Sequence, residues 1–145
     1  MILLDANILL YAQIRDYPQH EPIRAWLDER LSGEDGVGIP WASILAFLRI
    51  STNRRVFPRA HTIAQAWEQM AQWLAQPNVW IPRPTERHGE ILRDVLLKSG
   101  VEGELVPDAD LAALAIEHGL AVCSTDGDFA RFPMARWIDP LKPRG

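Results

Sequence analysis

Short apolar segments alternate with longer amphipathic segments along this chain, and no other sequence feature limits the fold as much. The apolar segments occupy residues 2–4, 37–39, 79–81, 121–124 and 137–138. Strands this short and this uniformly apolar are typical of a parallel sheet that is buried on both faces. The segments between them carry apolar residues at helical spacing, so we expect helices to cover the sheet. The length of 145 residues suits one core, and we expect a single domain over residues 1–145.

The predicted helices have recognisable starts and ends. One runs over residues 18–31, one opens at Pro40, two follow the capping residues Thr62 and Thr85, and one runs from about residue 108 to residue 118. Gly100 and Gly119 are placed to end the last two. The expected apolar faces are Trp41, Ile44, Leu45 and Leu48 after Pro40, and Ile63, Ala66, Trp67, Met70, Ala71 and Leu74 after Thr62.

The charges are segregated along the chain. The net charge of −4 argues at first against a nucleic-acid partner. However, residues 36–67 contain no acid and carry Arg49, Arg54, Arg55 and Arg59, whereas residues 99–130 contain no Lys or Arg and seven acids. A basic surface beside an acidic one suits a phosphate-binding face next to a metal site. Ordinary solvated surface is the alternative interpretation.

Neither a membrane segment nor a disulfide is expected. No apolar run approaches the roughly 18 residues that a membrane-spanning helix needs. The N-terminus lacks a basic leader and a cleavage site, so its apolar run is interpreted as a strand and not as a signal peptide. Cys123 is the single cysteine and lies in an apolar stretch. These features predict a cytoplasmic protein.

Three aspartates are expected at one edge of the sheet. Asp5 directly follows the first predicted strand, and Asp126 follows the fourth. Sites in parallel sheets form beyond the carboxyl ends of the strands. Asp108 is the third candidate, because a carboxylate in the first turn of a helix is favoured and points outward. Crowded carboxylates repel one another unless a cation neutralises them, and oxygen ligands without a Cys or His cluster suit Mg²⁺ or Mn²⁺. Phosphodiester hydrolysis is the natural reaction for such a site.

Each of these acids also has a purely structural interpretation. Asp5 and Asn7 could cap a helix that begins near Ile8, and Asp108 could be an ordinary helix-start residue. The segment 126–128 has the composition of a turn, in which Asp128 could cap a short following segment. The joint pattern favours the site.

Four motifs occur in a characteristic order. They are Leu-Leu-Asp-Ala-Asn at residues 3–7, the segment 41–53, Pro-Asp-Ala-Asp-Leu-Ala-Ala-Leu-Ala at residues 107–115, and Ser-Thr-Asp-Gly-Asp-Phe at residues 124–129. In this order and spacing they resemble the PIN domain family, and especially the VapC-type toxins, over about residues 1–139. The resemblance implies a three-layer α/β/α sandwich with a central parallel sheet. It also implies Mg²⁺- or Mn²⁺-dependent cleavage of RNA by a toxin that forms a homodimer and is neutralised by a small antitoxin protein.

The resemblance also assigns roles to residues. Asp5, Asp108 and Asp126 would be the catalytic metal ligands, with Asp128 as a further acid at the metal. Asn7 and Thr125 would orient the carboxylates or the scissile phosphate.

One position departs from the family pattern. Many PIN domains carry a glutamate on the helix after the second strand, and alignment on Arg49 places Ala46 there. Arg49 lies three residues later on the same helix face, where it could hold a phosphate, pair with a site acid or form a surface salt bridge. Arg54, Arg55 and Arg59 could contact RNA backbone or be solvated.

Two other functions remain open at this point. A catalytically inactive PIN-like module that binds RNA or protein is supported by Ala46. A phosphotransfer domain would use Asp5 as the phosphorylated nucleophile. Such a domain usually has a second aspartate two residues on, where this chain has Asn7, and a well-placed lysine; the only lysines are Lys98 and Lys142.

The histidines and tryptophans are interpreted as mainly structural. His20, His61, His88 and His118 show no metal-ligand spacing. Trp67 is predicted to lie in the core. For Trp26, Trp41 and Trp73 a partner groove is the alternative to the core, because large aromatic side chains are enriched at interfaces.

Overall fold

A five-stranded parallel sheet forms the centre of the protein, in the strand order β3-β2-β1-β4-β5. The structure is a computed structural model that describes residues 1–142. The strands are β1 (Ile2–Leu4), β2 (Val37–Gly38), β3 (Val79–Trp80), β4 (Ala121–Cys123) and β5 (Trp137–Ile138). The first strand is therefore the middle one, between β2 and β4. Every predicted strand is confirmed, with ends that agree to within one residue.

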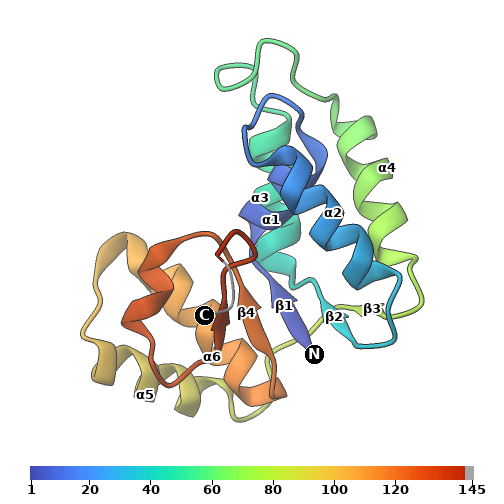
Figure 1. The fold of residues 1–145 in the computed structure, drawn as a ribbon. Helices are drawn as coiled ribbons and strands as arrows, with labels where there is room; N and C mark the ends of the chain where they lie inside the picture. Colours follow the sequence, from blue (N-terminus) through green and yellow to red (C-terminus); the bar gives the residue numbers. More distant parts are fainter. Residues whose placement is uncertain (143–145) are drawn as a thin grey trace.

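Helices cover both faces of this sheet (Figure 1). They are α1 (Ala6–Gln13), α2 (His20–Leu31), α3 (Trp41–Ser51), α4 (Ile63–Leu74), α5 (His88–Ser99) and α6 (Val106–His118), with short 3-10 helices η1 (Gly103–Leu105) and η2 (Gly127–Arg131). Successive strand residues point to opposite faces. Ile2 and Leu4 therefore pack with residues of α1–α4, whereas Leu3 packs with residues of α5 and α6. The expected three-layer α/β/α sandwich is confirmed.

Several helix ends follow the sequence signals. Thr62 caps α4 in a capping box, accepting from the Gln65 amide while the Gln65 side chain accepts from the Thr62 amide. Gly100 and Gly119 end α5 and α6 with φ of 66° and 68°, a left-handed conformation that glycine adopts without a steric penalty. Within residues 1–142, none of the helices combines the length and the apolar character that crossing a membrane requires.

The start of α5 differs from the prediction. Thr85 does not cap this helix, which begins at His88. Its hydroxyl instead donates to the carboxylate of Glu117 on α6, at 2.6 Å. His88 contacts the same carboxylate through Nδ1 and the carboxylate of Asp110 through Nε2, so it links α5 to α6. The Glu117 carboxylate on the neighbouring helix therefore bonds to Thr85 and His88, and Thr85 is not used as the cap of α5.

The buried face of α3 is rotated from the predicted one. Ile44 is buried as expected, but Trp41 and Leu45 are 43% and 61% exposed, and Phe47 takes their place in the core. The small side chain of Ser43 is buried because its hydroxyl donates to the Leu4 carbonyl at the end of β1, at 2.7 Å. That bond fixes which side of α3 faces the sheet.

The prediction that Trp67 lies in the core is wrong. Trp67 is 46% exposed, and Ile63 one turn before it is 62% exposed. Trp73 is buried instead, with its ring 5.1 Å from that of Phe47 in an edge-to-face arrangement. The sequence of α4 has apolar residues on two adjacent faces. The face that carries Trp73 packs against α3, where the large ring fills the space beside Phe47, and the face that carries Ile63 and Trp67 is left exposed.

Candidate metal centre

Asp5 lies where β1 ends and α1 begins. It is the N-cap residue of α1, and its Oδ1 accepts from the Ala6 amide at 2.8 Å. Its Oδ2 accepts from the hydroxyl of Ser124 at 2.7 Å. Burial raises the pKa of Asp5, the hydrogen bonds from Ser124 and Ala6 oppose this, and the charge of Asp126 adds to it. The capping interpretation of Asp5 is confirmed, and it is compatible with the site interpretation, because one carboxylate oxygen caps the helix and the other bonds to Ser124 directly after β4.

Ser124, directly after β4, connects the residues of this edge. Besides donating to Asp5, its hydroxyl accepts from Asn7 Nδ2 and from the Asp126 amide, each at 3.0 Å. Asn7 Nδ2 also lies 3.4 Å from Asp5 Oδ2, and Asn7 Oδ1 accepts from the Thr125 amide at 3.4 Å. Neighbouring parallel strands β1 and β4 bring these two segments together, as the topology predicted. Sequence reasoning did not single out Ser124; the signal available was a polar residue at the end of an otherwise apolar strand.

Three aspartates converge beside Asp5. Asp108, Asp126 and Asp128 each offer a carboxylate oxygen, and these atoms lie within 4.8 Å of one another. Asp108 is in the first turn of α6, and Asp126 caps η2 by accepting from the Asp128 amide at 2.9 Å. Partial burial raises the pKa of Asp108 to about 6, with further contributions from the charges of Asp5, Asp126 and Asp128. Four carboxyl groups therefore share one electrostatic environment.

This cluster fits a divalent cation of the hard, oxygen-preferring kind. Carboxylates this close together are mutually repulsive, and this repulsion adds to the larger effect of partial burial in raising the pKa of Asp108. A cation bound between them would remove that repulsion, and oxygen-only ligands select Mg²⁺ or Mn²⁺ over zinc. Within residues 1–142, neither a histidine nor a cysteine belongs to the cluster.

Comparison with known proteins shows the family to which the chain belongs. A sequence model described as the PIN domain matches residues 2–134. The chain belongs to the PIN domain family. It is similar to Ribonuclease VapC37 of Mycobacterium tuberculosis, with 45% identity over 140 residues that cover 97% of each chain.

Solved structures with the same fold are more distant in sequence. The chain in VapBC2 from Rickettsia felis, bound to a DNA fragment from its promoter, aligns with a TM-score of 0.69 and 16% identity, covering 95% of this chain and 98% of that one. A chain of a toxin–antitoxin complex from Klebsiella pneumoniae aligns with a TM-score of 0.63 and 16% identity, covering 99% and 100%. At these identities the likeness concerns the fold of the PIN domain.

The helix that follows β2 in this PIN domain carries no acid. Ala46 lies one turn after Ser43, the residue bonded to the end of β1, and is half-buried. Arg49, one turn further, is exposed and forms no ion pair with any of residues 1–142. The alternative interpretation of Arg49, a surface salt bridge, is therefore wrong for the described residues. Among the described residues, Arg131 forms the one ion pair with these acids, with its Nε 3.9 Å from Asp128 Oδ1. Sequence reasoning did not identify this residue.

Proposed function

We propose that this PIN domain is a metal-dependent endoribonuclease, the toxin of a type II toxin–antitoxin pair. The observation that carries this proposal is the convergence of Asp108, Asp126 and Asp128 next to Asp5 at the carboxyl edge of the sheet. The similarity to Ribonuclease VapC37 over nearly the whole of both chains supports RNA as the substrate.

The residues at this edge of the sheet have different proposed roles. Asp108, Asp126 and Asp128 would hold a Mg²⁺ ion, with Mn²⁺ as a possible substitute, and Asp5 would complete the ligand set. Bound there, the ion supplies positive charge that lowers the pKa of a water molecule and stabilises the leaving oxygen of the phosphodiester. Ser124 and Asn7 hold the Asp5 carboxylate in place through the contacts described above. Thr125 and Arg49 are proposed to orient and steady the scissile phosphate.

The partners follow from the same proposal. We expect a small antitoxin protein to neutralise the toxin, and we expect the toxin to form a homodimer in the cytoplasm. The similarity in fold to a chain of a toxin–antitoxin complex supports the first expectation. The genome should carry a short upstream reading frame whose product has a basic DNA-binding N-terminal part and an amphipathic C-terminal part. Absence of such a neighbour, together with no protein co-purifying from the native host, would argue against the toxin assignment.

Nuclease activity is tested with the purified protein and total cellular RNA. Wild type should cleave RNA when Mn²⁺ or Mg²⁺ is added and should stop when EDTA is added. Asp108→Asn should lose cleavage, whereas the matched variant Asp94→Asn, an exposed aspartate on α5, should retain it. An inactive binding module, which the alanine at position 46 would favour, predicts no metal-dependent cleavage by wild type.

A further inference from the structure

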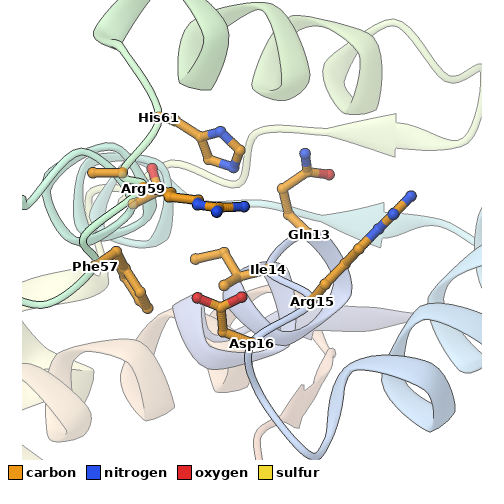
Figure 2. A pocket seen from close by; sticks show the side chains of 9 residues that line it. Gln13, Ile14, Arg15, Asp16, Phe57, Arg59 and His61 are labelled. Atoms are coloured by element: carbon orange, nitrogen blue, oxygen red, sulfur yellow. The ribbon is translucent and has the colours of Figure 1, made fainter.

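A cavity of about 250 Å³ lies where the end of α1 meets the loop that joins α3 to α4 (Figure 2). Its walls come from residues 13–16 and from Ser51 and the loop after it. None of the four aspartates of the metal centre lines this cavity. It is therefore a separate feature of the molecule, at the opposite end of α1 from Asp5.

The lining of this cavity carries net positive charge. Figure 2 shows the Arg59 guanidinium in the middle of the lining side chains, with His61 on one side and Ile14 on the other. Arg15 and Asp16 also line the cavity, so two guanidinium groups stand against one carboxylate. Neither arginine forms an ion pair with any of residues 1–142. Their donor groups are available to an anion.

A buried hydroxyl in the same cavity lacks a partner. Ser51 is 1% exposed, and its Oγ makes no hydrogen bond to any of residues 1–142. A serine near a helix end usually bonds to a backbone carbonyl one turn earlier, as Thr52 does to Leu48 at 2.7 Å. Buried polar groups are nearly always hydrogen-bonded, so an unpaired one that lines a cavity points to a ligand that pairs with it.

A second hollow continues from this cavity along α4. Gln13 and His61 line both of them. The second hollow measures about 470 Å³, and the other polar side chains that line it are Gln65, Glu68, Gln69 and Gln72. Amide side chains both donate and accept hydrogen bonds, which suits the sugars and bases of an extended strand more than it suits an apolar helix.

We propose that the cavity binds a backbone phosphate of the RNA strand at a position away from the cleaved bond. A phosphate offers several strong acceptor oxygens to the guanidinium groups of Arg59 and Arg15, which line the cavity, and to the unpaired hydroxyl of Ser51. Arginine is the side chain best suited to a phosphate. The cavity therefore takes an RNA phosphate as its ligand. This assignment rests on the proposed ribonuclease function.

The position of the cavity agrees with such a role. Asp5 caps the start of α1, and the cavity begins at its last residue, Gln13. At a rise of 1.5 Å per residue, the two sites are about 12 Å apart along one helix. A single RNA strand covers this distance in a few nucleotides, so the bound phosphate would belong to a nucleotide a few positions from the cleaved bond.

The test measures RNA binding by three variants. A short fluorescein-labelled single-stranded RNA of mixed sequence is titrated in EDTA, which prevents cleavage, over a range of KCl concentrations. Arg59→Gln should lower the affinity several-fold and reduce the slope of log affinity against log salt by about 0.7, the value for one phosphate contact to a single strand. Ser51→Ala should lower the affinity with an unchanged slope, because it removes a neutral donor. Arg93→Gln, at an exposed arginine on α5, makes the same charge change away from the cavity and should bind as wild type does.

The outcomes separate this inference from the proposed function. Metal-dependent cleavage by wild type is measured on the same preparation, and its absence counts against the nuclease. If wild type cleaves RNA but Arg59→Gln keeps the wild-type affinity and slope, the cavity is not a phosphate site. If Arg59→Gln loses affinity for the antitoxin protein while binding RNA normally, the ligand is a peptide carboxylate and the inference is wrong. Circular dichroism checks that each variant is folded.

Discussion

Replacing Asp108 by asparagine should stabilise the metal-free protein. In the folded state the pKa of Asp108 is about 6, against an ordinary value of 3.8, because partial burial and three neighbouring carboxylates disfavour its charge. At pH 7 the carboxyl is ionised in both folded and unfolded states, so the folded state carries the whole electrostatic cost. An asparagine side chain has nearly the same shape and no charge, and it removes that cost.

The size of the gain follows from the pKa difference. Asp108 titrates about two pH units above 3.8, which corresponds to about 3 kcal/mol at 1.36 kcal/mol per unit. Because the side chain is partly in contact with water, screening reduces this to about 1–2 kcal/mol. For a chain of 145 residues, that increase in the free energy of unfolding raises Tm by roughly 3–7 °C.

The pH dependence provides the decisive control. Between about pH 4 and pH 6 the folded state binds more protons than the unfolded state. The destabilising effect of Asp108 on the wild-type protein therefore becomes smaller as pH falls. The gain from Asp108→Asn should therefore be clearly smaller at pH 5 than at pH 7. Thermal unfolding in EDTA, followed by circular dichroism, measures both, with Asp94→Asn as the control variant. A lower Tm for Asp108→Asn at pH 7 would mark Asp108 as a structural cap and refute the reasoning. Added Mg²⁺ should stabilise wild type more than the variant, because it binds the folded wild type more tightly.

Three further outcomes are expected. Expression without the antitoxin should arrest bacterial growth, and Asp5→Ala should relieve the arrest; equal toxicity at equal expression would contradict this. Ala46→Glu should tighten Mn²⁺ binding in calorimetry by about 1–2 kcal/mol if the new carboxylate reaches the ion, and unchanged affinity would show that residue 46 does not face the metal. Burial lowers the pKa of His88, but its bonds to Asp110 and Glu117 outweigh this and raise it, so His88 stabilises most below about pH 6.5 and loses that contribution as pH rises through its folded-state pKa. His88→Gln should therefore lower the free energy of unfolding by about 1.5–3 kcal/mol at pH 6 and by less at pH 9 in urea titrations; an equal loss at both pH values would exclude a charged His88.

The sheet and the cluster of aspartates at its carboxyl edge were predictable, because they depend on the spacing of apolar segments in the sequence and on the topology of a parallel sheet. Buried parallel strands are recognisable as short apolar runs, and the carboxyl ends of adjacent parallel strands must meet, which places Asp5 beside Asp126. Asp108 reaches the same edge because it lies in the first turn of α6, the helix that leads into β4. No side-chain detail was needed for these conclusions.

The faces of α3 and α4 were not predictable in this way. Both helices have apolar residues on more than one side, so their periodicity leaves the rotation about the helix axis undetermined. The bond from Ser43 to the end of β1 and the contact between Phe47 and Trp73 determine it, and both join residues far apart in the sequence. The role of Ser124 escaped prediction for a similar reason, since its partners Asp5 and Asn7 lie more than a hundred residues away.

The place of β1 in the middle of the sheet has a consequence for how the protein is made. Ile2, Leu3 and Leu4 pair with Ala121, Val122 and Cys123, so β1 must wait for a partner strand that is synthesised more than a hundred residues later. Until β4 emerges, Asp5 lacks its bond from Ser124, and Asp126 and Asp128 have not been synthesised. Pairings this distant in sequence form late in folding. Until β4 and the segment after it have been synthesised, a nascent chain therefore cannot assemble the cluster of aspartates that is proposed to hold the metal.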